Sequence, residues 1–333
     1  MSVSLTMWAI TVAAILVLVV LDFLTVSRKP HEVSFREAAL WSVFYIAVAV
    51  AFGVFVWVWQ GGDFGTQYFA AYLVEKSLSV DNLFVFVIIL AQFAVPSIYH
   101  QRVLLVGVVL ALVLRAIFIA VGAAALAAFS FTFVIFGAIL IWTGIQLFRH
   151  RNADPEPKDN LVVRTVRRWY PITPDYHDTK LFVRLDGRRM ATPLLLVMVA
   201  IASTDLLFAL DSIPATFGVT QEPYLVFTAN AAALLGLRAL YFLLKGLLDK
   251  LIYLSMGLAI ILVFIGLKLI LTFAHEMNTE IPKIPTVFSL VVIAVILIVV
   301  TVASLIKVRR DPGARAHAGT ITEPRHREDE PPA

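Results

Sequence analysis

Four acidic residues lie inside long apolar segments of the sequence, namely Glu75, Asp81, Asp205 and Asp211. An ionised carboxylate in hydrocarbon costs at least about 2.5–3.5 kcal/mol, so each one requires a partner, a proton or a cation. The histidines all lie in predicted loops or termini and the chain has no cysteine, so these segments offer only oxygen ligands. Oxygen-only sites suit Mn²⁺, Mg²⁺ or Ca²⁺ better than Zn²⁺ or Cu⁺. The residues therefore predict a site for a hard divalent cation, which would repel oxyanions.

Neutral oxygen ligands lie near these acids. Ser77, Ser79 and Asn82 surround the first pair, and Asn230 is a further candidate ligand. The acids within each pair are six residues apart, a rotation of roughly 600° on a regular helix, so they would not share one face. Pro214 removes a backbone hydrogen bond near Asp211. Local unwinding there would change the direction of the side chains and free carbonyl oxygens for a cation.

Basic residues lie in the same apolar segments, and their number matches that of the acids: Lys76, Arg115, Arg238 and Lys268. A purely structural set of ion pairs is therefore the alternative to a cation site. Buried pairs are a poor source of stability, which favours a functional role. We expect Arg115 and Arg238 to orient the carboxylates, and Lys76 to act in proton coupling. Asp22 is expected to be an interfacial residue at a helix end.

The composition requires a lipid environment for these segments. Of the 333 residues, 60% are hydrophobic and only 15% are charged, and the mean hydropathy is +0.88. These values exclude a soluble globular enzyme. No nucleophile and base are visible in the apolar segments, so we predict neither enzymatic activity nor a cofactor. The net charge of +4 reports the orientation of the chain in the membrane rather than a nucleic-acid partner.

The sequence predicts an all-α polytopic membrane protein with about nine transmembrane helices, because about 20 apolar residues cross the hydrocarbon core. The predicted spans cover residues 5–26, 38–59, 67–94, 102–126, 129–148, 193–218, 223–244, 251–273 and 286–306. An outside N-terminus and an inside C-terminus put 22 of the 27 Lys and Arg in inside segments and only Lys283 in an outside one, and the other four lie within spans. Cytoplasmic loops retain basic residues, so this orientation is favoured.

Short sequence echoes relate two groups of three spans. The echoes pair residues 79–84 (SVDNLF) with 203–208 (STDLLF), 114–117 (LRAI) with 237–240 (LRAL), and 144–147 (GIQL) with 266–269 (GLKL). The third and sixth spans run in opposite directions, so the echoes predict an inverted 3+3 repeat. In many transporters of this architecture the substrate lies near the midplane between the repeats.

The predicted organisation has six parts: peripheral spans in residues 1–66, the first repeat in 67–148, a basic cytoplasmic loop in 149–192, the second repeat in 193–273, an outer loop and ninth span in 274–306, and a disordered tail in 307–333. The loop is expected to be solvated beside anionic lipid headgroups. The alternative for this loop is the docking of a stress-response partner protein. The tail is rich in Pro, Gly and charge, which is typical of disorder.

At these motifs the chain resembles the TerC family of integral membrane proteins, in the wider group of lysine-exporter-like transporters. The resemblance rests on residues 75–86, 205–215 and 227–242, and extends over residues 5–306. It implies a multi-pass protein of the bacterial cell membrane, with a role in manganese export, metal homeostasis or tellurium resistance. It carries over five acidic-motif residues as metal ligands: Glu75, Asp81, Asn82, Asp205 and Asp211. Ala229 replaces the family's Ser before Asn230, so a hydroxyl ligand is missing there.

Three functions remain open from the sequence. The first is a transporter of divalent cations, most of all an exporter of Mn²⁺, that works by alternating access of the two repeats. The second is a non-transporting membrane scaffold for tellurite or metal stress response, which acts through the basic loop and tail. The third is export of an organic cation or an amino acid.

Overall fold

The computed structural model describes residues 3–27, 33–150, 161–169, 171–177, 180–185, 188–244, 251–278, 280–282 and 284–311. Eleven helices and two strands form in these parts of the chain: α1 (Leu5–Ser27), α2 (Phe35–Gln60), α3 (Gly62–Gln92), α4 (Ser97–Ala128), α5 (Thr132–Arg149), α6 (Leu161–Trp169), β1 (Phe182–Leu185), β2 (Arg188–Ala191), α7 (Pro193–Val219), α8 (Pro223–Leu235), α9 (Leu237–Leu244), α10 (Leu254–Met277) and α11 (Thr286–Arg310).

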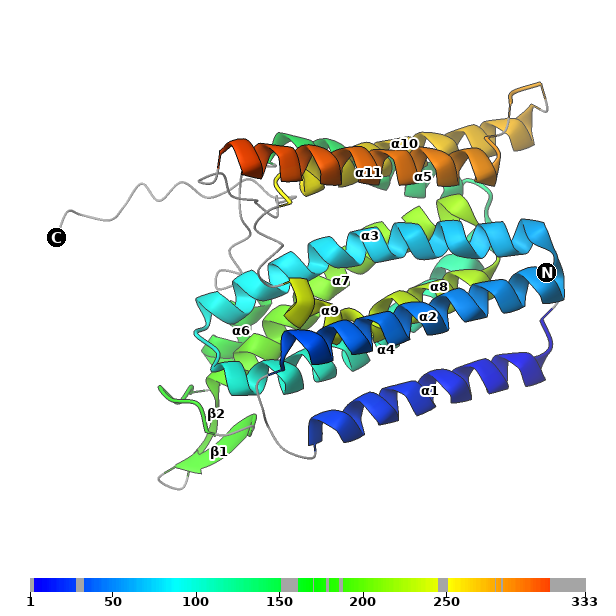
Figure 1. Ribbon diagram of the computed structural model, residues 1–333. Coiled ribbons are helices and arrows are strands. Elements are labelled where there is room, and N and C mark those ends of the chain that lie inside the picture. Colours follow the sequence, from blue (N-terminus) through cyan, green and yellow to red (C-terminus); the bar gives the residue numbers. More distant parts are fainter. Residues whose placement is uncertain are drawn as a thin grey trace.

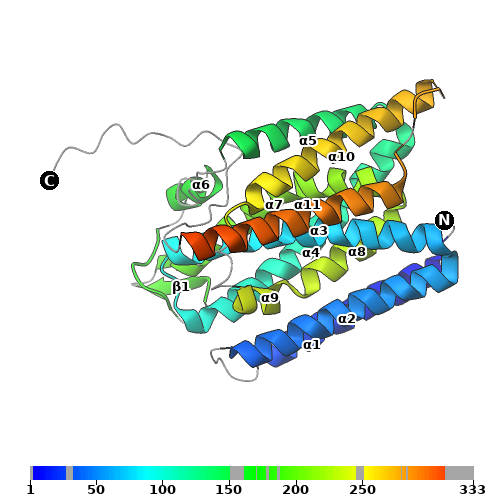
Figure 2. The same ribbon diagram turned by 45° about the horizontal axis from the view of Figure 1, so that its top comes forward.

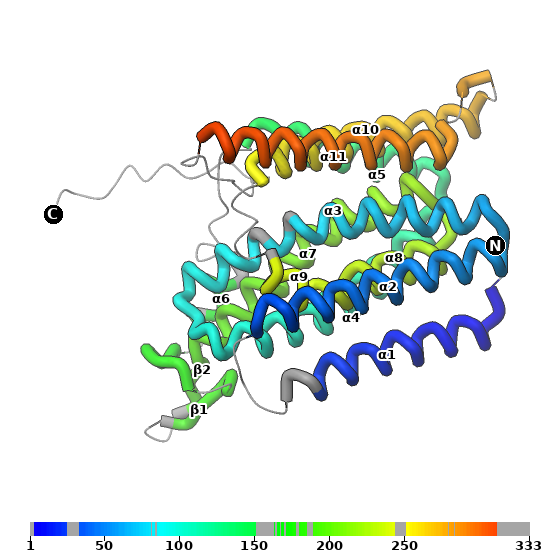
Figure 3. The backbone as a smooth tube through the Cα atoms, in the orientation of Figure 1, coloured from blue at the N-terminus to red at the C-terminus, as the bar shows by residue number. Residues whose placement is uncertain are grey.

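The long helices lie side by side in one bundle (Figure 1). Helix α1 lies at one edge, α5 and α10 at the opposite edge, and α3 and α7 between them, as the turned view also shows (Figure 2). The tube view shows that α6 and the two strands gather at the end of the bundle where α3 ends and α7 begins (Figure 3). The helices at the centre are therefore the ones that carry the acidic motifs.

Seven helices in the described residues are long and apolar enough to cross a membrane, and the bent pair α8 and α9 gives an eighth. They confirm an all-helical polytopic membrane protein. Helix α3 has 31 residues but is not among the seven, because Glu75, Lys76 and Asp81 lie in its middle. The count of nine spans therefore stays a prediction.

The predicted span over residues 223–244 is not one straight helix. Helix α8 ends at Leu235 and α9 begins at Leu237, with a bend of 40° between them. Gly236 lies at the break, and a Cβ atom there would come within 3.1 Å of Cβ of Tyr45 on α2. The glycine thus allows α2 to approach closely and weakens the helix at the same point.

The expected unwinding near Asp211 is wrong, because α7 runs unbroken from Pro193 to Val219 with Pro214 inside it. Residues 212–219 are all buried. Packing on all sides of this segment stabilises the helix in spite of the backbone donor that proline lacks. Asp205 and Asp211 therefore point to different sides of α7.

The predicted loop over residues 149–192 is partly packed rather than solvated throughout. Val163 of α6 is fully buried within the core, and β1 and β2 form an antiparallel pair. The Tyr176 hydroxyl donates a hydrogen bond of 2.7 Å to the carbonyl of Phe93, just beyond α3, and burial raises the pKa of Tyr176 to about 12. Residues 151–160 of the predicted loop and 312–333 of the predicted tail lie outside the described residues, whereas residues 307–310 are helical.

Helices α5 and α10 touch through their backbones. A Cβ atom on Gly137 would lie 2.7 Å from the carbonyl oxygen of Gly266, and one on Gly266 would lie 2.7 Å from that of Gly137. A Cβ atom on Gly144 would lie 2.8 Å from the carbonyl oxygen of Ala259. Only glycine allows these approaches, so the two helices are locked in one relative position.

Candidate functional site

A buried arginine on α4 joins the acidic motifs of α3 and α7. The Nη1 group of Arg115 donates hydrogen bonds to Oε1 of Glu75 and, at 3.1 Å, to Oγ of Ser212. Its Nη2 group donates to Oδ1 of Asp205 at 3.3 Å. The side chain of Arg115 is completely buried, as is that of Glu75. We call these residues, together with Asn82, the Arg115 cluster.

Asn82 completes the cluster. With its amide oriented so that both polar atoms are satisfied, its oxygen accepts a hydrogen bond of 3.0 Å from Nη2 of Arg115. Its amide nitrogen then donates to the carbonyl of Leu78, also at 3.0 Å. Glu75 and Asn82 are two helical turns apart on α3, and Asp205 and Ser212 have the same spacing on α7. Each helix therefore presents one polar face to the arginine.

The cluster holds more acid than base. Two carboxylates face one guanidinium, so its formal charge is negative when both acids are ionised. Among the residues that the structure describes, the second oxygen of Asp205, Oδ2, is buried without a hydrogen-bond partner, and the same is true of Oγ of Ser79 on the polar face of α3. Buried polar atoms of this kind are rare in native structures because they cost free energy. They are unused oxygen ligands beside a negative charge.

A row of hydroxyl groups continues the site along α7. The Thr216 hydroxyl lies 3.3 Å from Oε2 of Glu75, and one turn further the Thr220 hydroxyl donates to Oε1 of Gln67 on α3 at 2.6 Å. Thr220 and Gln67 line a polar cavity of about 240 Å³ at the end of α7, which also contacts Lys268 of α10. Polar groups therefore follow the interface of α3 and α7 from the cluster to this end of the bundle.

Asp211 does not join the cluster. Its carboxylate accepts a hydrogen bond of 2.9 Å from the Thr143 hydroxyl of α5. This follows from the unbroken α7, since six residues turn Asp211 away from the side on which Asp205 lies.

The other predicted residues have separate surroundings. Lys76 donates to the carbonyl of Ala233 on α8 at 3.2 Å, a backbone group rather than a carboxylate. Asn230 is buried on α8, which packs against α3 and α4, and neither of its amide atoms has a hydrogen-bond partner. The side chain of Asp81 lies outside the described residues, although its backbone belongs to α3.

Arg238 of α9 binds Asp22 of α1. Its Nε group donates to both oxygens of Asp22 at 3.1 Å, and its Nη2 group adds a third bond. Asp22 is only 3% exposed. Sequence reasoning treated Asp22 as an interfacial residue at a helix end and did not predict this buried pair, in which α1 packs Asp22 against Arg238 of α9.

Among the residues that the structure describes, no three His, Cys, Asp or Glu side chains are close enough to hold a metal ion together. In this conformation the guanidinium of Arg115 lies between the carboxylates that would bind a cation. Sequence reasoning missed Ser212, Thr216 and Thr220. Their signal was present in the spacing, because three polar residues four apart follow Asp205 on one face of α7.

Comparisons with known proteins agree with a membrane protein. The sequence model of the integral membrane protein TerC family matches residues 60–312. An uncharacterized membrane protein of Myxococcus xanthus is 43% identical over 95% of the chain and 97% of its own length. The thylakoid membrane protein TERC of Arabidopsis thaliana is 40% identical over 76% of the chain and 65% of its own length.

A third relative carries a functional name. The putative membrane-bound redox modulator Alx of Photorhabdus laumondii is 37% identical over 81% of the chain and 87% of its own length. No solved structure matches the chain.

Proposed function

The chain belongs to the TerC family of integral membrane proteins, and from this premise we propose that it transports a divalent metal cation, with export of Mn²⁺ as its main activity. The proposed site lies in the Arg115 cluster, where Glu75, Asn82 and Asp205 are the ligands and Arg115 leaves when the cation binds. Asp81 and Asn230 are further candidate ligands, and Asp211 lies outside the site in the described conformation.

The imbalance of charge in the cluster carries this proposal. A scaffold needs as many bases as acids, whereas Arg115 faces both Glu75 and Asp205. The unpartnered oxygens of Asp205 and Ser79 add ligands of the type that Mn²⁺, Mg²⁺ and Ca²⁺ prefer. A divalent cation would neutralise the two acids fully, and one guanidinium cannot. Exchange of Arg115 for the cation is therefore electrostatically balanced.

Packing between the two halves supports an inverted repeat. Helix α4 packs on α7, and α8 packs on α3. A two-fold axis in the membrane plane that relates α3 to α7 and α4 to α8 would convert one of these interfaces into the other. The contacts of α5 with α10 agree: Gly137 meets Gly266, and Gly144 meets Ala259. The offset of 122 that relates the third pair of echoes pairs Gly137 with Ala259 and Gly144 with Gly266. The repeat would therefore convert the first of these contacts into the second. We therefore keep nine spans, an outside N-terminus and alternating access as parts of the proposal.

The break between α8 and α9 fits the same mechanism. Transporters bind their substrates beside discontinuous helices, whose ends offer free backbone groups. Gly236 separates Asn230 from Arg238, so both halves of the bent pair carry buried polar side chains. The predicted orientation, which follows from the basic residues of the loops, puts α9 on the cytoplasmic side. An exported cation would enter the protein from that side.

The competing proposal is a scaffold without transport, held together by buried ion pairs. The balanced pair of Arg238 and Asp22 favours it for that part of the molecule. The name of the Photorhabdus relative suggests redox modulation, but the chain has no cysteine and so has no thiol of its own for such chemistry.

The deciding experiment measures metal uptake into inside-out membrane vesicles that contain equal amounts of the wild type, Asp205→Asn or Asp211→Asn. Mn²⁺, Ca²⁺, Mg²⁺ and Zn²⁺ are compared in parallel. We expect Mn²⁺ to enter with the wild type and with Asp211→Asn, and not with Asp205→Asn. Equal uptake with all three proteins and with empty vesicles would contradict transport and favour the scaffold.

A further inference from the structure

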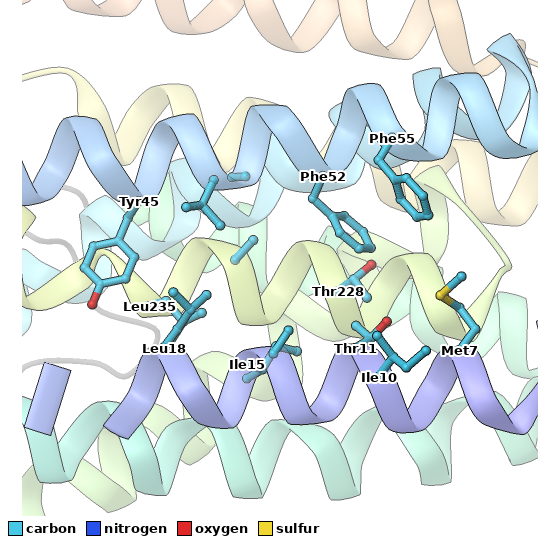
Figure 4. Close-up of a pocket in the computed structure, with 14 residues that line it drawn as sticks. Met7, Ile10, Thr11, Ile15, Leu18, Tyr45, Phe52, Phe55, Thr228 and Leu235 are labelled. Atoms are coloured by element: carbon cyan, nitrogen blue, oxygen red, sulfur yellow. The ribbon is translucent and has the colours of Figure 1, made fainter. Parts of the chain in front are cut away.

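A deep apolar cleft separates α1 from α2. It has a volume of about 330 Å³ and is lined almost entirely by carbon atoms of α1, α2 and α8. Figure 4 shows Met7, Ile15 and Leu18 of α1 along one wall, with Phe52 and Phe55 of α2 along the other. Helix α8 forms the floor between them. The cleft is outside the Arg115 cluster and shares no residue with it.

The length of the cleft matches one leaflet of a bilayer. Met7 and Leu18 are eleven residues apart on α1, which is about 16 Å along the helix axis. Half of a hydrocarbon core of about 30 Å is about 15 Å. The cleft begins near the N-terminus of α1 and the C-terminus of α2, and it ends near the middle of the bundle. It therefore covers the depth of one acyl chain in the leaflet beside that end.

The threonine hydroxyls of the lining are satisfied within the protein, and the hydroxyl of Tyr45 is buried without a hydrogen-bond partner among the described residues. The Thr11 hydroxyl and the Tyr224 hydroxyl share a hydrogen bond of 2.7 Å, and the Thr228 hydroxyl donates to the carbonyl of Tyr224 at 2.8 Å. Water in the cleft would find too few partners. An isoprenoid quinone is the alternative occupant, and the unpartnered hydroxyl of Tyr45 would have to turn into the cleft to serve one of its carbonyl groups. The lining therefore suits a ligand segment that has no polar atoms.

Two polar contacts hold the cleft open. Thr11 bonds Tyr224 at one end of α1, and Asp22 bonds Arg238 near the other. Close backbone contacts of α1 are with α4 and α8, so α1 is fixed on the core while its face toward α2 stays free. The cleft is for this reason a built feature of the fold and not loose packing at its edge.

We propose that the cleft binds one acyl chain of a bilayer phospholipid from the leaflet beside the N-terminus of α1. The headgroup lies at the mouth, beside Trp8 and Trp59, in the interfacial position that tryptophan prefers. The chain reaches down to Leu235, the last residue of α8 before the bend. The lipid thus packs against the helix whose break separates Asn230 from Arg238. This inference does not depend on transport.

The test uses vesicles that contain the full protein and a phospholipid with a photoactivatable diazirine in the middle of one acyl chain. After illumination, the labelled peptides are identified by mass spectrometry. Ala14→Phe and Ala232→Phe each fill the cleft from a different wall. The matched control is Ala13→Phe, since Ala13 is the exposed neighbour on α1 that does not line the cleft.

We expect the wild type and Ala13→Phe to be labelled on α1, α2 and α8, and each filled variant to be labelled at least about fivefold less, because added bulk leaves no room for the chain. Native mass spectrometry of the purified wild type should retain one phospholipid, which the filled variants lose. Equal labelling of all four proteins would overturn the proposal and indicate only the general lipid belt. Loss of the label on addition of a quinone, but not of excess unlabelled phospholipid, would also overturn it. Circular dichroism at matched concentration checks that both filled variants are folded.

Discussion

Two arginines in the same short motif bind different sets of acidic side chains. Arg115 and Arg238 each follow a leucine and precede an alanine at equivalent positions of the proposed repeats. Arg115 binds two carboxylates from two central helices and leaves oxygens unpartnered nearby. Arg238 binds one carboxylate through both oxygens and fastens the peripheral helix α1. Both arginines are buried, so burial alone does not distinguish them. On the proposed function, charge balance distinguishes a site that can exchange Arg115 for a metal cation from a structural ion pair.

The largest effect on transport is expected from Arg115→Gln. Without the guanidinium, Glu75 and Asp205 are free to bind a divalent cation, so the affinity for Mn²⁺ should rise by about tenfold or more, about 1.4 kcal/mol. Transport should fall by about two orders of magnitude, because release of the cation now lacks its internal replacement. Equilibrium binding of ⁵⁴Mn²⁺ and vesicle flux separate the two effects. Weaker binding in Arg115→Gln than in the wild type would break the comparison.

Arg238→Gln should act on stability instead. It leaves the carboxylate of Asp22 buried without its base, which costs about 3–5 kcal/mol of unfolding free energy. The double variant Asp22→Leu with Arg238→Met should recover most of that loss, since an apolar pair can replace a balanced ion pair. Thermal unfolding in detergent measures both. Vesicle flux per folded molecule should stay close to wild type in the double variant, and loss of flux there would give Arg238 a role in transport.

Thr216→Val tests whether a hydroxyl group beside the Arg115 cluster contributes to the affinity for Mn²⁺. The change removes the hydroxyl that lies 3.3 Å from Oε2 of Glu75 and keeps the shape of the side chain. We expect a loss of about 1 kcal/mol, the value of one buried hydrogen bond, which appears as a severalfold weaker apparent affinity for Mn²⁺ in vesicle uptake. Thr216→Ser should restore the wild-type affinity. Identical affinities in all three proteins would remove Thr216 from the site.

The smallest effect is expected from Gln101→Leu, the corresponding change beside Arg238. The Gln101 oxygen accepts a long bond of 3.5 Å from Nη1 of Arg238, so its loss should lower the unfolding free energy by about 0.5–1.5 kcal/mol. The affinity for Mn²⁺ should not change. A change in affinity that equals that of Thr216→Val would show that the two arginines act on one site.

The sequence predicted the apolar segments and the special status of the acids, because both depend on composition and on the cost of charge in hydrocarbon. It failed where the outcome depended on tertiary packing. Pro214 did not break α7, because the residues around it are all buried and packing holds the helix. Gly236, in contrast, lies at the break between α8 and α9. Asp22 could not be paired with Arg238 from sequence, since 216 positions separate them. Whether Asp211 belongs to the site was decided by the regularity of α7.

The contacts of Gly137 with Gly266 bear on how the two halves could move. At this point two antiparallel backbones meet directly, with Ile141 and Ile270 packed beside the glycines, so this contact is the closest join between the two halves. A rocking motion would keep this point fixed and displace groups in proportion to their distance from it. Helix α1, at the opposite edge of the bundle (Figure 1), would then travel furthest. Electron spin labels placed on α1 and on α5 should show this as a broad distance distribution that narrows when Mn²⁺ is added.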